Sequence, residues 1–268
     1  MGKFIKHGTI EDFGNQWKIH GLLNRDHWTS DQMFRDHFPE NFDFSIFNRA
    51  KVLEVGSGSG RILHMIYSYG PSQLIGIEPS KGFENLKINT ATLKNLHLEN
   101  TTGSKFIYKD LDVVISFGVI HHIPMADEVI ENVYKNLKTG GLFIMWVYGY
   151  ENNKVYVILQ KLLRSFTRKL PDNVLDKFSY LLSHVFDFYG RTSKTFFSSR
   201  LPLSNYFENV FSKCGRIQKK YIIFDQLNPA YSKYYKKFEV IDLLKRAGFN
   251  EIEMFHRHNY SWTAIAKK

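Results

Sequence analysis

The sequence of 268 residues has one cysteine, seven prolines and no long uninterrupted apolar run. A single cysteine, Cys214, cannot form an internal disulfide or a cysteine-based zinc site. Because no stretch of about 18 uncharged apolar residues is present, no membrane-spanning helix is predicted. Residues 1–7 lack the apolar core of a secretory signal, so we expect a cytoplasmic protein in a reducing compartment.

Acidic residues are also comparatively scarce. Against 26 Asp and Glu stand 36 Lys and Arg, which gives a net charge of +10. Such an excess is compatible with binding to nucleic acid, to an anionic membrane surface or to a phosphorylated small molecule. Much of it lies in 154–169 and 213–237, but no run of five basic residues and no nucleic-acid-binding module is recognisable. We therefore expect mainly a solvated basic surface.

Apolar residues make up 43% of the chain, which is enough to bury a substantial core. From residue 49 to about 147, short β-branched runs alternate with helical patterns, which indicates βαβ units and a parallel sheet covered on both faces. The predicted strands are 51–55, 73–78, 96–100, 112–117 and 141–147, the last of them after a turn at 138–141. The predicted helices are 61–69, 79–86 and 127–137.

Beyond residue 150 the pattern becomes helical. Residues 155–170 and 174–188 carry apolar side chains at helical spacing, with Pro171 and Asp172 between them as a stop and a cap. Core burial is the favoured interpretation of both helices, and docking of residues 161–166 on a membrane or partner is the alternative.

The α/β pattern returns near the end of the chain. A helix at 238–247 is ended by Gly248, and strands are predicted at 251–256 and 261–266. Because the loop between these strands is short, they must form an antiparallel hairpin.

A glycine-rich turn follows the first predicted strand. Residues 54–60 read Glu-Val-Gly-Ser-Gly-Ser-Gly and open a helix, where a backbone without side chains can approach a ligand closely. A dinucleotide fingerprint would need a glycine where Arg61 stands. Glu78 ends the second strand, where an α/β nucleotide site places a carboxylate for ribose hydroxyls. An ordinary tight connection is the alternative for an isolated glycine turn.

Together these features resemble the class I S-adenosylmethionine-dependent methyltransferase family. Residues 54–60 match its motif I, Glu78 matches its ribose-binding acid, and residues 116–123 match its fourth-strand block. The turn at 137–141 also matches, although the family commonly has proline in place of Thr139. The resemblance is specific for the cofactor and silent about the substrate.

The resemblance implies a Rossmann-like seven-stranded sheet, mostly parallel, with one antiparallel strand inserted by the final hairpin. S-adenosylmethionine would lie across the carboxyl ends of the strands. Glu99 and Asn100 are the nearest candidates for contacts to the adenine. The implied cofactor-binding residues are Glu54, Gly56, Ser57, Gly58, Gly60, Glu78, Pro79, Glu99, Asn100, Phe117, Gly118 and Val119.

Four segments follow from this scheme. We expect residues 1–45 to form an N-terminal helical lid and 46–149 the cofactor-binding core. Residues 150–220 would be a helical cap insertion. Residues 221–268 would complete the sheet and line the acceptor site.

Two adjacent histidines follow the fourth strand. In the family this position borders the acceptor, so His121 is a candidate general base and His122 a structural or orienting residue. The alternative is that either histidine caps the next helix or binds a backbone carbonyl. A subgroup of quinone O-methyltransferases holds a metal through a Glu-x-x-Glu-His segment. Gly118 stands here in place of the first glutamate and His121 in place of the second, so we expect no metal site.

A polar and aromatic block at 224–235 and a second at 256–262 resemble elements of bacterial methyltransferases linked to surface polysaccharides. The predicted acceptor-binding residues are Asp225, Asn228, Tyr231 and Arg257. Asp225 would bind a hydroxyl, and Arg257 would bind a phosphate in bidentate fashion. The alternative for Asp225 and Asn228 is a cap and turn, the alternative for Tyr231 is packing in the core, and the alternative for Arg257 is solvation in the hairpin loop.

These observations predict methyl transfer to an oxygen of a small polar metabolite, sugar-linked or phosphate-bearing, as in surface polysaccharide biosynthesis. Two alternatives stay open. An RNA or tRNA methyltransferase is favoured by the charge, but the chain lacks an appended binding module. A catalytically inactive S-adenosylmethionine-binding protein would retain the fold without the acceptor chemistry.

Overall fold

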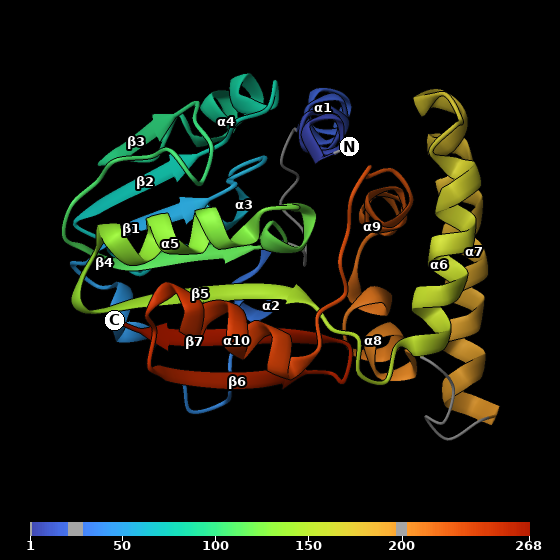
Figure 1. The fold of residues 1–268 in the computed structure, drawn as a ribbon. Coiled ribbons are helices and arrows are strands. Elements are labelled where there is room, and N and C mark those ends of the chain that lie inside the picture. The colour runs from blue at the N-terminus through green and yellow to red at the C-terminus, as the bar shows by residue number, and fades with distance from the viewer. Residues whose placement is uncertain (1, 21–28, 197–202) are drawn as a thin grey trace.

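One seven-stranded sheet organises the structure, a computed structural model that describes residues 2–20, 29–196 and 203–268 (Figure 1). Its strand order is β3-β2-β1-β4-β5-β7-β6. The strands are β1 (Lys51–Val55), β2 (Gln73–Ile77), β3 (Leu96–Glu99), β4 (Leu111–Phe117), β5 (Leu137–Tyr148), β6 (Glu251–Arg257) and β7 (Ser261–Lys267).

Strands β1 to β5 pair in parallel, and β7 pairs antiparallel with both β5 and β6. Leu53 in β1 lies opposite Ile75 on one side and Val114 on the other, and all three are fully buried. The predicted fold class and the antiparallel final hairpin are therefore confirmed. Because the parallel strands end at the same edge, the loops after β1, β2 and β4 meet there.

Strand β5 begins earlier than predicted. The expected turn at 138–141 lies inside it, and the pairing with β4 jumps from Leu111–Leu137 to Val113–Leu142 as a bulge. The Gly140 N–H donates to the carbonyl of Lys268, which continues the contact with the end of β7. Pairing across the sheet thus overrides the local turn signal.

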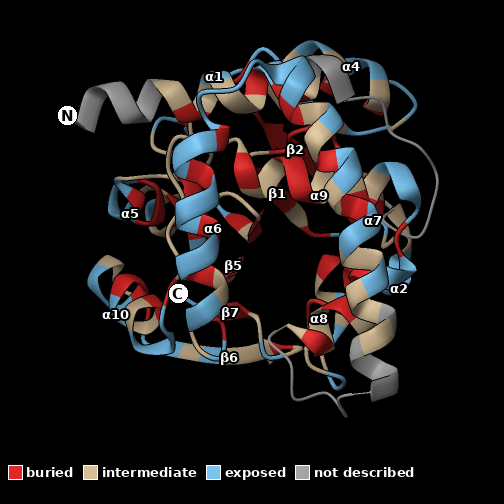
Figure 2. Cartoon of the chain, turned by 90° about the vertical axis from the view of Figure 1, so that its right-hand side faces the viewer, coloured by how far each residue is buried: buried red, intermediate tan, exposed pale blue. Residues whose placement is uncertain are grey.

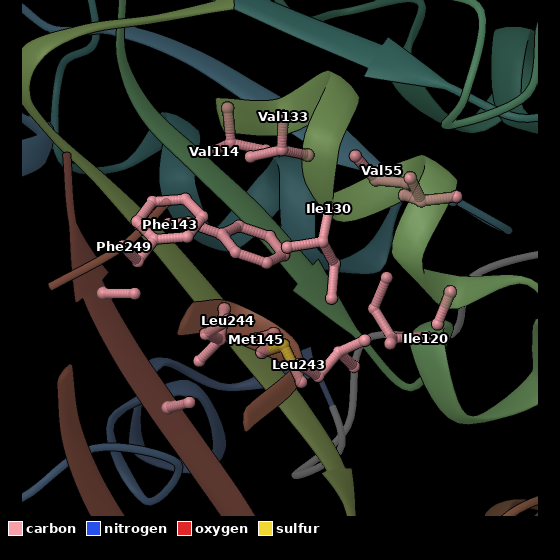
Figure 3. Close-up of a cluster of buried hydrophobic side chains, with 14 of the residues drawn as sticks. Val55, Val114, Ile120, Ile130, Val133, Phe143, Met145, Leu243, Leu244 and Phe249 are labelled. Carbon is pink, nitrogen blue, oxygen red and sulfur yellow. The ribbon is translucent and has the colours of Figure 1, made fainter. Parts of the chain in front are cut away.

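Two helices cover one face of the sheet: α5 (Ala126–Asn136) and α10 (Lys237–Ala247). Their buried side chains Ile130, Val133, Leu243 and Leu244 pack against residues of the strands such as Phe143 (Figure 3). Acidic residues in the first turn of α5 suit the positive end of the helix dipole. Most apolar side chains of both helices thus lie in the core, although Phe238 in the first turn of α10 is exposed.

The other face is covered by a second cluster. It includes α3 (Arg61–Tyr67), α4 (Phe83–Thr90), the short helix α2 (Asp31–Arg35) and the 3₁₀ turn η2 (Phe44–Phe47). Phe34 and Phe47 are fully buried there with Leu63 and Ile66. Part of the segment predicted as a lid is therefore part of the main core.

The remaining helices form a cap beyond the carboxyl edge of the sheet (Figure 1). The predicted helices at 155–170 and 174–188 are present as α6 (Lys154–Thr167) and α7 (Asp172–Phe196). They are joined by α8 (Ser204–Asn209), η4 (Phe211–Lys213) and α9 (Arg216–Leu227), which the sequence patterns missed. The cap has its own small core of Leu175, Phe207, Phe211, Ile223, Phe224 and Leu227.

The outward faces of α6 and α7 remain exposed (Figure 2), so the expectation of core burial is wrong for this side of the helices. Seventeen large hydrophobic side chains of the described residues are exposed, and twelve lie between positions 155 and 188. We call these twelve the outer apolar face. They are Val155, Ile158, Leu159, Leu162, Leu163, Phe166, Leu170, Val174, Tyr180, Leu181, Val185 and Phe188. Within the described ranges, no helix is long and apolar enough to cross a bilayer.

Candidate functional site

A cavity of about 500 Å³ lies at the carboxyl edge of the sheet. Its walls come from the loops after β1, β2 and β4, from helix α1 (Gly2–His20) and from the cap helices. Figure 1 shows α1 and α9 beside this edge, between the sheet and the outer helices α6 and α7. The cavity therefore joins the glycine turn to the cap.

The glycine turn wraps closely around the ends of the neighbouring strands. Gly56, Gly58 and Gly60 all have positive φ angles, of 75°, 51° and 87°, which side chains rarely adopt. The N–H groups of Gly56 and Ser57 both donate to the Ile77 carbonyl at 2.9 Å. A Cβ at Gly56 would lie 2.5 Å from a methyl of Val119, so only glycine fits between these loops.

Glu78 organises the two loops that face the cavity. Its Oε2 accepts the Gly58 N–H at 2.9 Å, and its Oε1 accepts the Ser80 N–H at 3.0 Å. The turn made by Glu78 and Ser80 delays the next helix, so α4 begins at Phe83 rather than at the predicted residue 79. Glu78 lines the cavity, and each carboxylate oxygen can still accept another hydrogen bond. The residues present therefore fit a ribose diol.

Glu54, the acid before the turn, is buried and does not line the cavity. Its Oε2 has no hydrogen-bond partner. Burial raises the pKa of this carboxyl to about 8, and the nearby Ser57 hydroxyl opposes the shift. Glu54 is therefore mostly protonated at neutral pH in the folded protein.

The predicted cofactor residues divide into two groups. Seven of them line the cavity: Gly56, Gly58, Glu78, Pro79, Phe117, Gly118 and Val119. Five do not: Glu54, Ser57, Gly60, Glu99 and Asn100. Glu99 accepts a hydrogen bond from the Tyr108 hydroxyl at 2.9 Å, and Asn100 donates to the Glu78 carbonyl at 2.7 Å. Asn100 thus supports the loop that carries the ribose-binding candidate.

Several cavity residues were not predicted. Thr102, Gly103 and Ser104 line it just beyond β3, where the adenine contact was expected from Glu99 and Asn100. Helix α1 contributes Phe13 and Trp17, among other residues. A Cβ at Gly58 would lie 3.2 Å from the Trp17 ring, so this ring closes over the glycine turn. No spacing motif in the sequence points to these residues.

His122 reaches the cavity. Its Nδ1 lies 2.9 Å from the Tyr231 carbonyl oxygen, which can only accept, so Nδ1 carries the proton. Nε2 is then an unprotonated acceptor, and it is buried without a partner. Burial lowers the pKa of His122 to about 3, and the imidazole is neutral at pH 7. The ring also makes an edge contact with Phe13 at 4.8 Å between centroids.

His121 is fully buried and is absent from the cavity wall. Its ring lies 3.7 Å from that of Tyr148 between centroids, and neither ring nitrogen has a hydrogen-bond partner. Burial lowers the pKa of His121 well below its usual value. Its predicted role as the base stays a prediction, and the geometry favours its neighbour for contact with an acceptor.

A polar network on the cap side contains Asp225, which lines the cavity from α9. Its Oδ2 accepts the Tyr148 hydroxyl at 3.1 Å, and its Oδ1 accepts Gln16 Nε2 from α1 at 3.3 Å. Gln226 Nε2 donates to the Tyr148 oxygen at 2.6 Å. Burial raises the pKa of Asp225 to about 6, so its carboxylate is ionised at neutral pH but close to titration.

Arg164 of α6 supplies positive charge to this network. Only 9% of the residue is exposed, its Nε has no hydrogen-bond partner, and burial lowers its pKa. Arg164 does not line the cavity, but its charge lowers the pKa of both His122 and Asp225. A buried positive charge therefore lies close to the Asp225 carboxylate at the acceptor end of the cavity.

The other predicted acceptor residues lie differently. The Asn228 and Tyr231 side chains do not line this cavity, although the Tyr231 carbonyl positions His122. Arg257 does line it, but its guanidinium donates twice to Asp36 Oδ2, at 2.8 and 2.6 Å, and once to the Tyr260 hydroxyl at 2.7 Å. The remaining N–H groups contact His37 and Met33. The expected phosphate contact of Arg257 thus lacks a free donor.

Among the described residues, no group of three or more His, Cys, Asp or Glu side chains is arranged to hold a metal ion.

Part of the chain resembles known methyltransferases in sequence. A family model described as a methyltransferase domain matches residues 53–143. A tRNA U34 carboxymethyltransferase of Shewanella woodyi is 27% identical over 134 residues, which cover 48% of this chain and 40% of the relative. The matched region thus spans about two fifths of that relative's length.

Two solved structures share the fold. A S-adenosylmethionine-dependent methyltransferase of Aquifex aeolicus has a TM-score of 0.53 at 12% identity, covering 94% of this chain and 97% of the other. A methyltransferase of Thermotoga maritima, described as a possible histamine N-methyltransferase, has a TM-score of 0.50 at 15% identity and covers 98% and 99%. The matched domain, the strand order and the glycine turn together support a class I S-adenosylmethionine-dependent methyltransferase.

Proposed function

We propose that the protein transfers a methyl group from S-adenosylmethionine to an oxygen of a small polar molecule held on the cap side of the cavity. One observation carries the proposal. The same cavity is lined by Gly56, Gly58 and Glu78 at one end, and by His122 and Asp225 at the other. A donor bound at the first end would have its reactive group near the side chains of the second.

The donor end is built for a nucleoside. Glu78 would accept hydrogen bonds from ribose hydroxyls, and Thr102 to Ser104 would border the base. When bound, S-adenosylmethionine supplies an electrophilic methyl group on a positively charged sulfur. Trp17 would exclude water from the glycine turn, which favours displacement over hydrolysis.

The acceptor end must align an oxygen and remove its proton. His122 Nε2 would accept a hydrogen bond from a second donor group of the acceptor molecule and so orient it, which leaves the proton of the reacting hydroxyl to the base. With a pKa near 3, His122 holds a proton only weakly. Asp225 has a pKa near 6, which is better matched to proton removal at neutral pH, and we assign it as the base.

Arg164 supports an anionic acceptor. A buried guanidinium that forms no direct ion pair with a carboxylate of the described residues is costly, and a phosphate or carboxylate on the acceptor would offset part of that cost. This is why a phosphate-bearing or acidic sugar-linked metabolite, as in surface polysaccharide biosynthesis, is the favoured class. The aromatic and amide residues around Asp225 suit hydroxyl-rich molecules equally well.

An RNA acceptor is the second candidate. The curated relative is a tRNA U34 carboxymethyltransferase, and the net charge of +10 would attract a polynucleotide. Against it, α1 and the cap helices enclose the acceptor end, so a nucleotide would have to be extruded from its strand to enter.

The test is incubation of the protein with a methyl-labelled donor and either small-molecule extract or total RNA, followed by mass spectrometry. Label in a small acidic or hydroxylated metabolite is the expected result. Label in RNA would replace the proposal with the second candidate. Donor binding without any labelled product would support a catalytically inactive cofactor-binding protein.

A further inference from the structure

The outer apolar face of α6 and α7 is the largest concentration of exposed hydrophobic side chains among the described residues. Phe166 and Phe188 are 71% and 70% exposed. Both helices are strongly amphipathic, so these side chains belong to an apolar side of each helix that the rest of the chain does not cover. Apolar residues scattered singly over a surface need no explanation, but twelve on α6, α7 and the turn that joins them indicate a binding surface.

Helices α6 and α7 lie on the side of the cap that is farthest from the sheet (Figure 1). Figure 1 shows them as the outermost helices, with α9 between them and the sheet, and Figure 2 shows their exposed residues from the cap side. The spacing of Val155, Ile158, Leu162 and Phe166 follows successive turns of α6, so these side chains form one stripe.

The charges on the same surface identify the occupant. Between residues 154 and 188 the exposed charged side chains are Lys154, Lys161, Arg168, Lys169, Asp172 and Lys177, of which one is acidic. Two further acids in α7, Asp176 and Asp187, are neutralised by ion pairs with Lys220 and Lys219. The outer apolar face is thus bordered almost entirely by positive charge.

Lysine is depleted from protein–protein interfaces, whereas a basic rim around an apolar helix face is typical of helices that lie in the headgroup region of a bilayer. We propose that the outer apolar face of α6 and α7 docks the protein on the surface of an anionic lipid bilayer. The apolar side chains enter the acyl boundary, and the basic side chains contact anionic headgroups.

Docking in this orientation would also position the cavity. Leu159 and Leu163 of α6 and Leu182 and Phe186 of α7 line its outer end, and the first two also belong to the outer apolar face. The acceptor end of the cavity therefore lies toward the bilayer. Docking through this face does not require the proposed reaction.

The test is sedimentation of the purified protein with vesicles of phosphatidylcholine alone or mixed with phosphatidylglycerol. We expect binding to the mixed vesicles that weakens with salt. The double variant Leu162→Glu, Phe166→Glu should lower the affinity about tenfold or more. Neither residue lines the cavity, so donor binding, measured by calorimetry, should persist.

Matched control variants carry the same kinds of substitution outside the outer apolar face. Ile88→Glu with Phe238→Glu alters two side chains of similar exposure, 63% and 64%, outside the face and should not change vesicle binding. Lys161→Gln with Lys169→Gln should lower binding about fivefold per charge. The corresponding control, Lys105→Gln with Lys245→Gln, also alters exposed lysines and should have no such effect.

Three outcomes would overturn the proposal. The first is equal or absent binding to both kinds of vesicle. The second is an equal loss of binding in the control variants. The third is self-association of the protein that Leu162→Glu with Phe166→Glu abolishes, since the face would then be covered by a second copy.

Discussion

Two pairs of helices with similar apolar patterns have opposite surroundings. Helices α5 and α10 bury Ile130, Val133 and Leu244 completely against the sheet. Helices α6 and α7 each pack on α9 with their inner side and leave Leu162, Phe166 and their neighbours exposed. An amphipathic pattern therefore predicts that a helix has an apolar face, but the rest of the chain decides whether anything covers it.

The two ends of the cavity differ in a related way. The sheet supplies backbone groups and one acid, Glu78, from short loops whose geometry the glycines fix. The cap supplies side chains such as Asp225 and Tyr148, which are joined by hydrogen bonds over long sequence separations. The first end is suited to one constant ligand, whereas the second can vary with the acceptor.

The largest expected effect is that of Asp225→Asn on methyl transfer. If Asp225 is the base, kcat should fall about 10²–10⁴-fold while donor affinity changes little. In the wild type, kcat should fall as pH decreases through about 6, because the carboxylate becomes protonated. The variant should lack this pH dependence, and a rate profile that keeps it would remove the assignment.

The same variant should gain stability. Burial raises the folded-state pKa of Asp225 from 3.8 to about 6, so the ionised side chain destabilises the folded protein, and the full effect is present above pH 6. We expect Asp225→Asn to melt at a higher temperature than the wild type at pH 8, with a smaller difference near pH 4. Thermal unfolding at the two pH values measures this.

A pair of leucine truncations compares the covered and uncovered helices directly. Leu244→Ala removes a fully buried side chain of α10 and should lower the free energy of unfolding by about 2–5 kcal/mol. Leu162→Ala removes a side chain of α6 that is 58% exposed and should change it by no more than about 0.5 kcal/mol. Urea unfolding without vesicles measures both. Comparable losses would mean that the α6 face is covered in solution.

Glu78→Ala isolates the donor end. Loss of hydrogen bonds from ribose to a carboxylate should weaken S-adenosylmethionine binding about 10–100-fold, as measured by calorimetry. Glu99→Ala is the control, because Glu99 bonds to Tyr108 and does not line the cavity. If both variants bound the donor equally weakly, Glu78 would have no specific part in binding.

A further prediction concerns Glu54, the buried acid before the glycine turn. Its pKa is raised from 4.5 to about 8, so the folded protein keeps a proton that the unfolded chain has lost, and the wild type loses stability as pH rises across this window. Glu54→Gln cannot ionise. Its melting temperature relative to the wild type should therefore increase from pH 5 to pH 8 and level off above. A constant difference would contradict the burial of this carboxyl with one oxygen left without a partner.

The sequence was sufficient to predict the sheet and to point to seven residues that line the cavity beside the glycine turn, because these features are local. A strand, a glycine turn and a helix follow one another directly, and Glu78 ends the neighbouring strand. The predicted adenine contacts Glu99 and Asn100 do not line the cavity, whereas Thr102 to Ser104 do, and these lie in an irregular loop without periodicity.

The acceptor end could not be predicted in the same way, because its contacts join distant parts of the chain. Gln16 and Asp225 are 209 residues apart, and Arg257 finds Asp36 across 221 residues. The polar and aromatic blocks around Asp225 and Arg257 predicted both residues equally as contacts to the acceptor. Only the tertiary arrangement distinguishes the carboxylate in the cavity wall from the guanidinium whose donors are already used.

Helix α1 touches both ends of the cavity, through Trp17 over Gly58 and through Gln16 on Asp225. Movement of α1 away from the cavity would break both contacts together, so the demethylated donor and the methylated product would dissociate in a single coupled step. We expect such coupling to make departure slower than chemistry, which a rapid-mixing experiment would register as a burst of product in the first cycle. Trp17→Ala should shorten the delay that follows the burst.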